Sequence, residues 1–332
     1  MEPDAMSALT ISDTLATTTD SLQLIELDHQ GILGIEGPDA VKFLQGQVTC
    51  DIRDLASPVS RAGAQCTPKG RMLSSFRVLQ SQPETLLLRA DTAMLEAIQK
   101  DLGKYIVFSK ARLSNRSEHY RLLGITGAGA AKYVEEISGQ TFSGNDAWLK
   151  YRQSFFIQLD EQRVECWLAS EDAVQLTSQL GTRTTKAPAN SWTLATIRAG
   201  FGEVYPETRE LFTPQSLNYQ LVNAINFRKG CYTGQEIVAR LHYKATLKRH
   251  MYRVTFRLPD GFSLPTPGAG IVDAQGKTLG ELVVAAVDRN NTAEALVVVP
   301  DNQLEHLYLA QHPEIQLTRL DLPYLIPLEN DH

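Results

Sequence analysis

The chain contains an internal repeat, which constrains its fold more than any other feature of the sequence. ILGIEGPDAVKFL begins at Ile32 and LLGITGAGAAKYV begins at Leu122; each has the pattern of a short apolar strand, a glycine turn and a helix start. A second pair follows, LLLRADTAMLEAIQ from Leu86 and CWLASEDAVQLTSQL from Cys166, in which a strand leads through an acidic cap into an amphipathic helix. Two copies of such a unit predict two related α+β subdomains packed side by side. Chance similarity is the alternative, because two short copies are a weak signal.

The pattern changes towards the C-terminus. The region from Trp192 to Glu236 is dense in Pro and Gly, which predicts long loops broken by short turns, and loops of that length are usually functional. From about Met251, the runs MYRVTFRL, GAGIVDA, ELVVAAVDR, EALVVVP and IQLTRLDL are rich in β-forming residues and are separated by Gly, Pro, Asp and Asn. This part of the chain predicts a small all-β domain, most simply a barrel.

We therefore predict an α+β protein of three domains. The predicted division is a flexible tail over 1–20, a discontinuous first α+β domain over 21–115 with 192–245, a second α+β domain over 116–191, and a C-terminal β-barrel over 246–326. The tail is acidic and rich in Ser and Thr, and it lacks the basic and apolar regions of a secretory signal.

Composition places the chain among ordinary globular proteins. It is 43% hydrophobic and 21% charged, with a net charge of −6, so nucleic-acid binding over the whole surface is not expected although a local basic patch is compatible with this charge. There is no run of 18 apolar residues, and we expect a cytoplasmic protein without a membrane partner. The four cysteines, at positions 50, 66, 166 and 231, form no C-x-x-C element, so we predict no metal site and a reducing compartment.

The stretch RKGCYTGQE, residues 228–236, sets Cys231 between two glycines rather than in an apolar run. Neighbouring Arg228 and Lys229 favour a thiolate, which suits a nucleophile or a redox thiol; a buried cysteine in a glycine turn is the alternative. The order Lys-Gly does not fit a phosphate-binding loop, in which Lys follows Gly. A catalytic pair with His242 is a weaker possibility.

Two further features suggest ligand contacts. The segment 237–259 carries six Lys or Arg residues and no acid, which suits a polyanion such as RNA or the glutamate tail of a folate; a solvated strand edge is the alternative. Trp192 begins the loop region and has the shape to stack on a ring such as a pterin, or to fill a core.

Two polar turns accompany these features. FLQGQVTCDI, residues 43–52, has the pattern of a helix that ends in a polar turn, and Asp51 in that turn is a carboxylate able to accept a paired donor such as an amino-pyrimidine edge. CTPKGRMLSSFRV, residues 66–78, has the pattern of a turn that enters a strand. Ordinary surface turns are the alternative for both.

Together these motifs resemble one family. KGCYTGQE resembles the signature of the YgfZ family, the folate-binding relatives of the glycine-cleavage T-protein. FLQGQVTCDI, CTPKGRM, YIVFSKA (105–111), WTLATIRAG (192–200), FTPQSLNYQ (212–220) and LPY (322–324) follow in the expected order, so that the resemblance covers about residues 20–326.

The resemblance implies a three-domain cloverleaf around a central channel that binds tetrahydrofolate or a derivative. It implies a part in the assembly or repair of iron–sulfur enzymes and, through them, in tRNA modification. The residues that match the family motif are Cys231 as a functional thiol, with Trp192, Lys229, Gly230, Tyr232, Gly234, Gln235 and Glu236 on the folate side. The early turn reads LDHQG where family members carry DDW, with Gln30 in place of a second tryptophan.

The leading hypothesis is thus a tetrahydrofolate-binding accessory protein of iron–sulfur maturation, with iron–sulfur enzymes or cluster assembly proteins as partners. In that hypothesis the pterin lies near both Trp192 and the Cys231 loop. A folate-dependent aminomethyl transferase is the second hypothesis. A tRNA-binding factor that uses a basic strand over 240–257 is the third.

Overall fold

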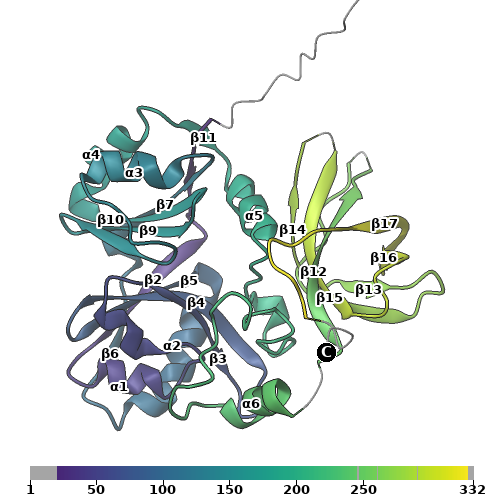
Figure 1. Ribbon diagram of the computed structural model, residues 1–332, viewed down its shortest axis with the longest axis horizontal. Coiled ribbons are helices and arrows are strands. Elements are labelled where there is room, and N and C mark those ends of the chain that lie inside the picture. Colours follow the sequence, from purple (N-terminus) through teal and green to yellow (C-terminus); the bar gives the residue numbers. More distant parts are fainter. Residues whose placement is uncertain (1–20, 245–246, 260, 290, 328–332) are drawn as a thin grey trace, which may run out of the picture.

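The computed structural model describes residues 21–244, 247–259, 261–289 and 291–327, and the predicted tail over 1–20 lies outside them. Figure 1 shows two mixed α+β bodies next to each other, with a third, all-β body beside both. The α+β class with a closed C-terminal barrel is therefore confirmed. No helix among the described residues is long and apolar enough to cross a membrane.

The first α+β body is a five-stranded sheet with helices on one side. Its strand order is β3-β4-β5-β2-β6, and all neighbours are antiparallel. The elements are β2 Gln30–Glu36, α1 Ala40–Gln45, η1 Ile52–Ala56, β3 Arg61–Cys66, β4 Met72–Gln82, β5 Thr85–Asp91, α2 Thr92–Ile106 and β6 Arg112–Asn115. Both β2 and β5 are apolar on both faces, because helices cover one face and the second α+β body covers the other.

The second α+β body repeats this plan with a six-stranded sheet of order β11-β1-β7-β10-β9-β8. Its elements are β1 Gln23–Glu26, η2 Ser117–His119, β7 Tyr120–Thr126, α3 Ala130–Ser138, β8 Trp148–Tyr151, β9 Ser154–Asp160, β10 Arg163–Ala169, α4 Ser170–Leu180 and β11 Thr185–Ala187. The repeated sequence stretches fall on corresponding elements: β2 and α1 match β7 and α3, while β5 and α2 match β10 and α4.

One strand lies in a different sheet from the one that the predicted boundary implies. β1 falls within 21–115, yet it pairs antiparallel with β7 and parallel with β11 in the second sheet. Leu24 packs in the second core, while Ile25 packs in the apolar layer between the two sheets. A strand that is apolar on both faces fits either sheet, so its sequence pattern did not reveal which one it joins.

The C-terminal body is a closed barrel of order β12-β15-β14-β13-β16-β17. Its strands are β12 Arg249–Arg257, β13 Gly270–Val272, β14 Thr278–Val287, β15 Thr292–Pro300, β16 Leu307–Leu309 and β17 His312–Leu320. One side of the barrel joins the core of the first body, where Met251, Val283 and Leu296 pack in one cluster with Phe212 and Tyr219.

A connecting segment holds the three bodies together. It comprises α5 Ala189–Arg198, η3 Pro206–Thr208, a long loop, and α6 Gln235–Tyr243. The long loop is anchored through buried hydrogen bonds, such as that from Asn218 Nδ2 to the Met251 carbonyl at 2.8 Å. Trp192 was predicted at the head of a loop region but lies within α5, which packs between the second sheet and the barrel.

Arg89 on β5 joins the two α+β bodies. Its guanidinium donates to Glu165 on β10 at 2.7 Å, to Glu203 of the connecting loop at 2.6 Å, and to Gln30 at 3.2 Å. Burial alone raises the pKa of Glu165, but the charges of Arg89 and Arg77 outweigh that effect and hold the pKa below its usual value. Arg89 is therefore the main charge that keeps this buried carboxylate ionised, with Arg77 in support.

We predict that Arg89→Ala lowers the free energy of unfolding by about 3–5 kcal/mol, because it leaves the buried Glu165 carboxylate without its countercharge. Urea-induced unfolding measures this loss. Arg121→Ala, which removes a partly exposed pair with Glu26, is the matched control and is expected to cost no more than about 1 kcal/mol. Equal losses in the two variants would contradict the role given to Arg89.

Candidate functional site

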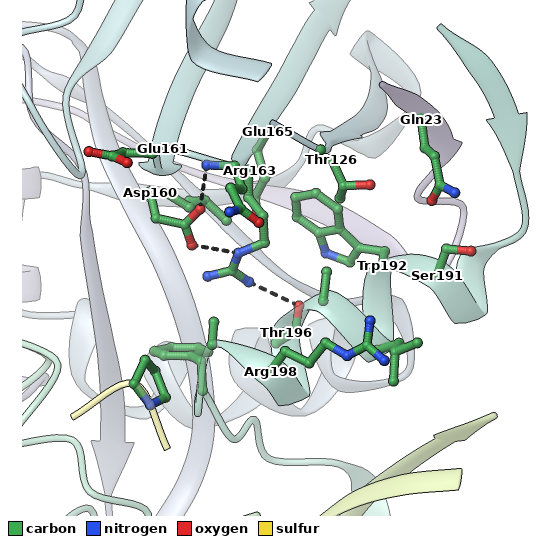
Figure 2. Close-up of a pocket in the computed structure, with 18 of the residues that line it drawn as sticks. Gln23, Thr126, Asp160, Glu161, Arg163, Glu165, Ser191, Trp192, Thr196 and Arg198 are labelled. Carbon is green, nitrogen blue, oxygen red and sulfur yellow. Dashed lines mark hydrogen bonds and ion pairs between the residues drawn. The ribbon is translucent and has the colours of Figure 1, made fainter. Parts of the chain in front are cut away.

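A cavity of about 1170 Å³ lies where the three bodies meet. Its lining includes Arg89 of the first body, Arg163 and Glu165 of the second, Trp192 and Arg198 of α5, and Asp288 of the barrel. Figure 2 shows Thr196 on α5 facing Arg163, which lies with Asp160 where β9 turns into β10, and shows Trp192 and Arg198 on the same helix. The volume suits a large organic ligand, and such sites are common at domain interfaces.

Trp192 forms one wall of this cavity and is 5% exposed. Its ring lies against the backbone of Gly124 on β7, where a Cβ atom would come within 2.3 Å of the indole. The glycine of the repeated LLGIT strand therefore makes room for the tryptophan, and any larger residue there would push the ring into the cavity.

Ion pairs hold most of the charges that line the cavity. Arg163 Nε donates to Asp160 at 2.8 Å and its Nη1 donates to Thr196 at 3.3 Å (Figure 2). Arg198 binds Asp288 and Glu294 of the barrel. These pairs fix the positions of the walls.

Glu203 is a part-buried carboxylate on the cavity wall that is held through one of its two oxygens. Its Oε1 accepts from Arg89, while Oε2 has no partner among the described residues. The side chain is 16% exposed, so it is held in place and still reachable. A buried, positioned carboxylate of this kind can accept hydrogen bonds from a ligand with adjacent N–H donors.

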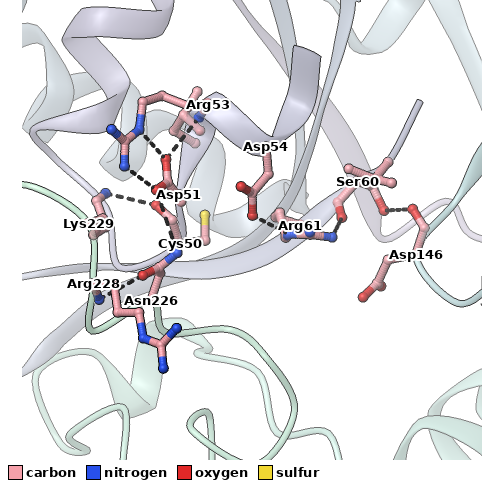
Figure 3. A network of polar contacts seen from close by, with 12 residues as sticks. Cys50, Asp51, Arg53, Asp54, Ser60, Arg61, Asp146, Asn226, Arg228 and Lys229 are labelled. Atoms are coloured by element: carbon pink, nitrogen blue, oxygen red, sulfur yellow. Dashed lines mark hydrogen bonds and ion pairs between the residues drawn. The ribbon is translucent and has the colours of Figure 1, made fainter. Parts of the chain in front are cut away.

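The Cys231 loop is built around a buried lysine. Lys229, 5% exposed, points its ammonium into the turn that follows α1 and donates to the carbonyls of Gln45, Val48 and Cys50 at 2.8, 2.6 and 2.8 Å. Figure 3 shows the bond to Cys50. Gln45 is the last residue of α1, so one of these bonds satisfies a free carbonyl at the helix end. Burial lowers the pKa of Lys229 to about 8, yet the three carbonyls use all three donors of an ammonium and keep it protonated in this turn.

The turn that receives Lys229 carries its own polar network. Asp51 accepts from Arg53 and from Gln45, and these bonds, with Arg53 the strongest, lower the pKa of Asp51 to about 2 (Figure 3). Asp51 is 5% exposed. The predicted polar turn is therefore a support for the Cys231 loop, and its carboxylate is already occupied.

The loop presents Cys231 to solvent. Lys229 and Tyr232 are buried on either side, with the ammonium 5.0 Å from the ring centroid, while Gly230 and Cys231 between them are exposed. Cys50, Cys66 and Cys166 are buried, and burial raises the pKa of each thiol, to about 12 in the first two. Cys231 is thus the accessible thiol among the four.

Gly234, Gln235 and Glu236 begin α6. Gly234 has a φ of +87° and lies so close to the Thr67 carbonyl that a Cβ would approach it to 2.5 Å, which requires glycine on both counts. Gln235 and Glu236 form the first turn of the helix, and Glu236 is exposed. None of the residues 228–236 lines the central cavity.

Comparison with known proteins identifies the family that has this architecture. Residues 4–170 match the family model of the GCVT N-terminal domain. The tRNA-modifying protein YgfZ of Photobacterium profundum is 34% identical over 311 residues, covering 91% of this chain and 92% of the relative. That of Photorhabdus laumondii is 33% identical over 300 residues, covering 88% of each. This chain belongs to the YgfZ family.

The fold of this YgfZ family member also has a solved counterpart. It is similar to the glycine cleavage system aminomethyltransferase T from Bartonella henselae, with a TM-score of 0.71, 18% identity, and coverage of 93% of this chain and 87% of the other. At that identity the likeness shows the shared fold alone.

The structure separates the YgfZ signature from the predicted ring-binding tryptophan. Trp192 packs in the apolar layer between the two sheets, whereas Tyr232 packs in the core of the first body. The cavity lining contains Trp192 but none of residues 228–236. That one ligand contacts both Trp192 and the Cys231 loop stays a prediction.

Glu203 and Arg89 are cavity residues that the sequence analysis did not select. Glu203 stands in GFGEVYPE, within the region predicted to be functional loop, and its acid between a glycine and an apolar residue is a weak signal. Arg89 stands in the apolar strand LLLRAD, where a buried cation indicates a buried partner.

The basic segment predicted as one strand is two elements. Residues 240–243 belong to α6, and the strand begins at Arg249. Arg240 and Lys244 are four residues apart, and at that spacing they share a helix face. In the strand, Arg249 pairs with Glu281 and Arg253 with Glu294, so those two cations are already neutralised.

We predict that Lys229→Met exposes the turn beneath the Cys231 loop, because three buried carbonyls lose their shared donor. The loss in stability is expected to be about 2–4 kcal/mol. Titration with a thiol reagent under native conditions should show one fast thiol in the unmodified protein and a second, Cys50, in the variant. Lys69→Met, at an exposed lysine of the neighbouring turn, is the control, and unchanged Cys50 reactivity in Lys229→Met would refute the carbonyl cage.

Proposed function

We propose that this YgfZ family member binds tetrahydrofolate in the central cavity. The observation that carries the proposal is the cavity itself: about 1170 Å³ at the meeting point of three bodies, with a tryptophan wall and a carboxylate on the same surface. A pterin needs a flat apolar contact and an acceptor for its amino-pyrimidine edge, and the described residues supply both.

Each part of the ligand has a matching group in the cavity. Trp192 offers the ring contact and Glu203 offers the free carboxylate oxygen. Arg289 lines the cavity without an acidic partner in the described chain, which suits the carboxylate tail of a folate. Tetrahydrofolate, when bound, supplies a carrier for one-carbon units, and the protein's part is to hold and orient it.

We further place the protein in the assembly or repair of iron–sulfur enzymes, in support of tRNA modification. Its relatives are named tRNA-modifying proteins, and its accessible thiol lies outside the cavity. A thiol at the surface can reach a macromolecule, and Cys231 is not among the residues that line the cavity. This arrangement suits a maturation factor that carries folate and uses Cys231 on a partner. No group of three or more His, Cys, Asp or Glu in the described residues could hold a metal ion, so a cluster would belong to that partner.

Tetrahydrofolate titration tests the first proposal. Calorimetry should give saturable binding, and Glu203→Gln should weaken it by about tenfold, because a charge-assisted hydrogen bond contributes about 1.5–3 kcal/mol. Trp192→Phe should also weaken binding, and it should abolish the ligand-dependent quenching of tryptophan fluorescence.

Two control variants accompany this titration. Glu161→Gln changes an exposed cavity carboxylate that forms no ion pair with the described residues, and Trp148→Phe changes a tryptophan outside the cavity. Both should bind as the unmodified protein does. Equal affinity in Glu203→Gln and Glu161→Gln, at equal melting temperature, would count against the proposed pterin site. Formation of methylene-tetrahydrofolate from an aminomethyl donor, above the uncatalysed rate, would favour a transferase instead.

We predict that Cys231→Ala folds as the unmodified protein does and binds tetrahydrofolate with the same affinity, because the side chain is exposed and outside the cavity. In cells that lack the native protein, this variant should fail to restore the activity of iron–sulfur enzymes. Full restoration would eliminate any role for the thiol.

A further inference from the structure

The Cys231 loop lies within a cluster of exposed cations. Arg228 adjoins the loop, Arg240 lies on α6, Lys244 directly follows that helix, and Lys69 comes from the turn between β3 and β4. None of the four has an acidic partner among the described residues, although many other arginines of this chain hold a carboxylate. Four unneutralised cations on one surface are a marked excess in a protein of net charge −6.

Close contacts place these cations on one continuous surface. A Cβ on Gly70 would lie 3.0 Å from Ile237, so the turn that carries Lys69 packs on α6. Gly234 at the start of α6 lies against Thr67 of the same turn. At the other end of α6, Phe227 stacks on His242 with ring centroids 3.7 Å apart, which brings Arg228 beside the end of the helix.

Aromatic rings accompany the charges. Tyr243 is 64% exposed and stands edge-on to both His242 and Phe227, with centroids 4.6 and 6.1 Å away. An exposed tyrosine held by two other rings is a rigid stacking surface that costs little entropy to use. Glu236 is the acid of this helix, and it lies in the first turn, where the helix dipole favours a negative charge.

We propose that this surface, consisting of Lys69, Arg228, Arg240, Tyr243 and Lys244, binds single-stranded RNA. Cations without partners neutralise phosphates, and an exposed ring accepts a base regardless of its sequence. An acidic protein would use the cations but would have no need of the ring. The proposal does not depend on the ligand of the central cavity, since no residue of this surface lines it. The proposed RNA site therefore lies on and beside α6. It is not on β12, where Arg249 and Arg253 are neutralised by ion pairs.

Fluorescence anisotropy with a labelled oligouridine of about 12 nucleotides, a length within the usual range for such sites, tests the proposal. For four phosphate contacts, the logarithm of the binding constant should fall with the logarithm of salt concentration at a slope of about −2.8. Arg240→Gln with Lys244→Gln should weaken binding at least tenfold and reduce the slope to about −1.4. The matched control, Lys132→Gln with Lys277→Gln, makes the same charge change at exposed lysines of α3 and the barrel and should change neither value.

Tyr243→Ala separates stacking from charge. It should weaken RNA binding about fivefold or more, since about fivefold corresponds to the smallest stacking energy usual for one base. The slope of the salt dependence should not change, because no charge is removed. If Tyr243→Ala has no effect and poly-L-glutamate competes as well as RNA at equal charge, the surface fits an acidic protein and the RNA proposal is wrong. Equal binding by the two double variants would also overturn it. Trp192→Phe and Glu203→Gln should bind RNA normally, so failure of the folate proposal would leave this result intact.

Discussion

The buried guanidinium of Arg89 is the interaction on which the rest of the structure depends. It joins a strand of the first sheet to Glu165 of the second sheet and to Glu203 of the connecting loop. A buried ion pair contributes little net stability compared with an apolar contact, but losing one partner is costly. Its value here is geometric, because it fixes both sheets and the loop relative to each other. Arg89, Glu165 and Glu203 all line the central cavity, so this geometry also sets the position of the free Oε2 of Glu203.

A second buried cation does for the Cys231 loop what Arg89 does for the cavity. Lys229 fills a turn with three carbonyls, as a bound metal ion would, and holds the loop from below. Arg89 and Lys229 are buried, and they donate to acceptors inside the protein. In contrast, Lys69, Arg228, Arg240 and Lys244 are exposed and have no acidic partner among the described residues. The buried cations Arg89 and Lys229 fix the cavity and the Cys231 loop, and the exposed cations remain available to bind a partner.

Local patterns in the sequence predicted most helices and strands. They did not predict features that depend on contacts between residues far apart in the chain. The repeat predicted β2 with α1 and β7 with α3, and the alternating C-terminal runs predicted the barrel. The place of β1 was not predictable, since both of its faces are apolar. Neither was the bond from Arg89 to Glu203, which joins positions 114 residues apart. Residues 240–257 were predicted to form one basic strand, because charge, unlike apolar spacing, carries no period that tells helix from strand.

The cavity and the Cys231 loop share a scaffold, although none of residues 228–236 lines the cavity. Residues 221–223 line the cavity, and the next residue, Ala224, accepts a 2.7 Å bond from Thr49 in the turn that Lys229 occupies. Such a chain of neighbouring residues would couple the cavity to the loop only if one of its elements had two alternative conformations. Thr49 Oγ1 also accepts from the Ala64 N–H at 2.9 Å, and both bonds are buried. A hydroxyl that both donates and accepts inside the core favours one arrangement, so Thr49 ties the residue after the cavity segment to the turn that receives Lys229.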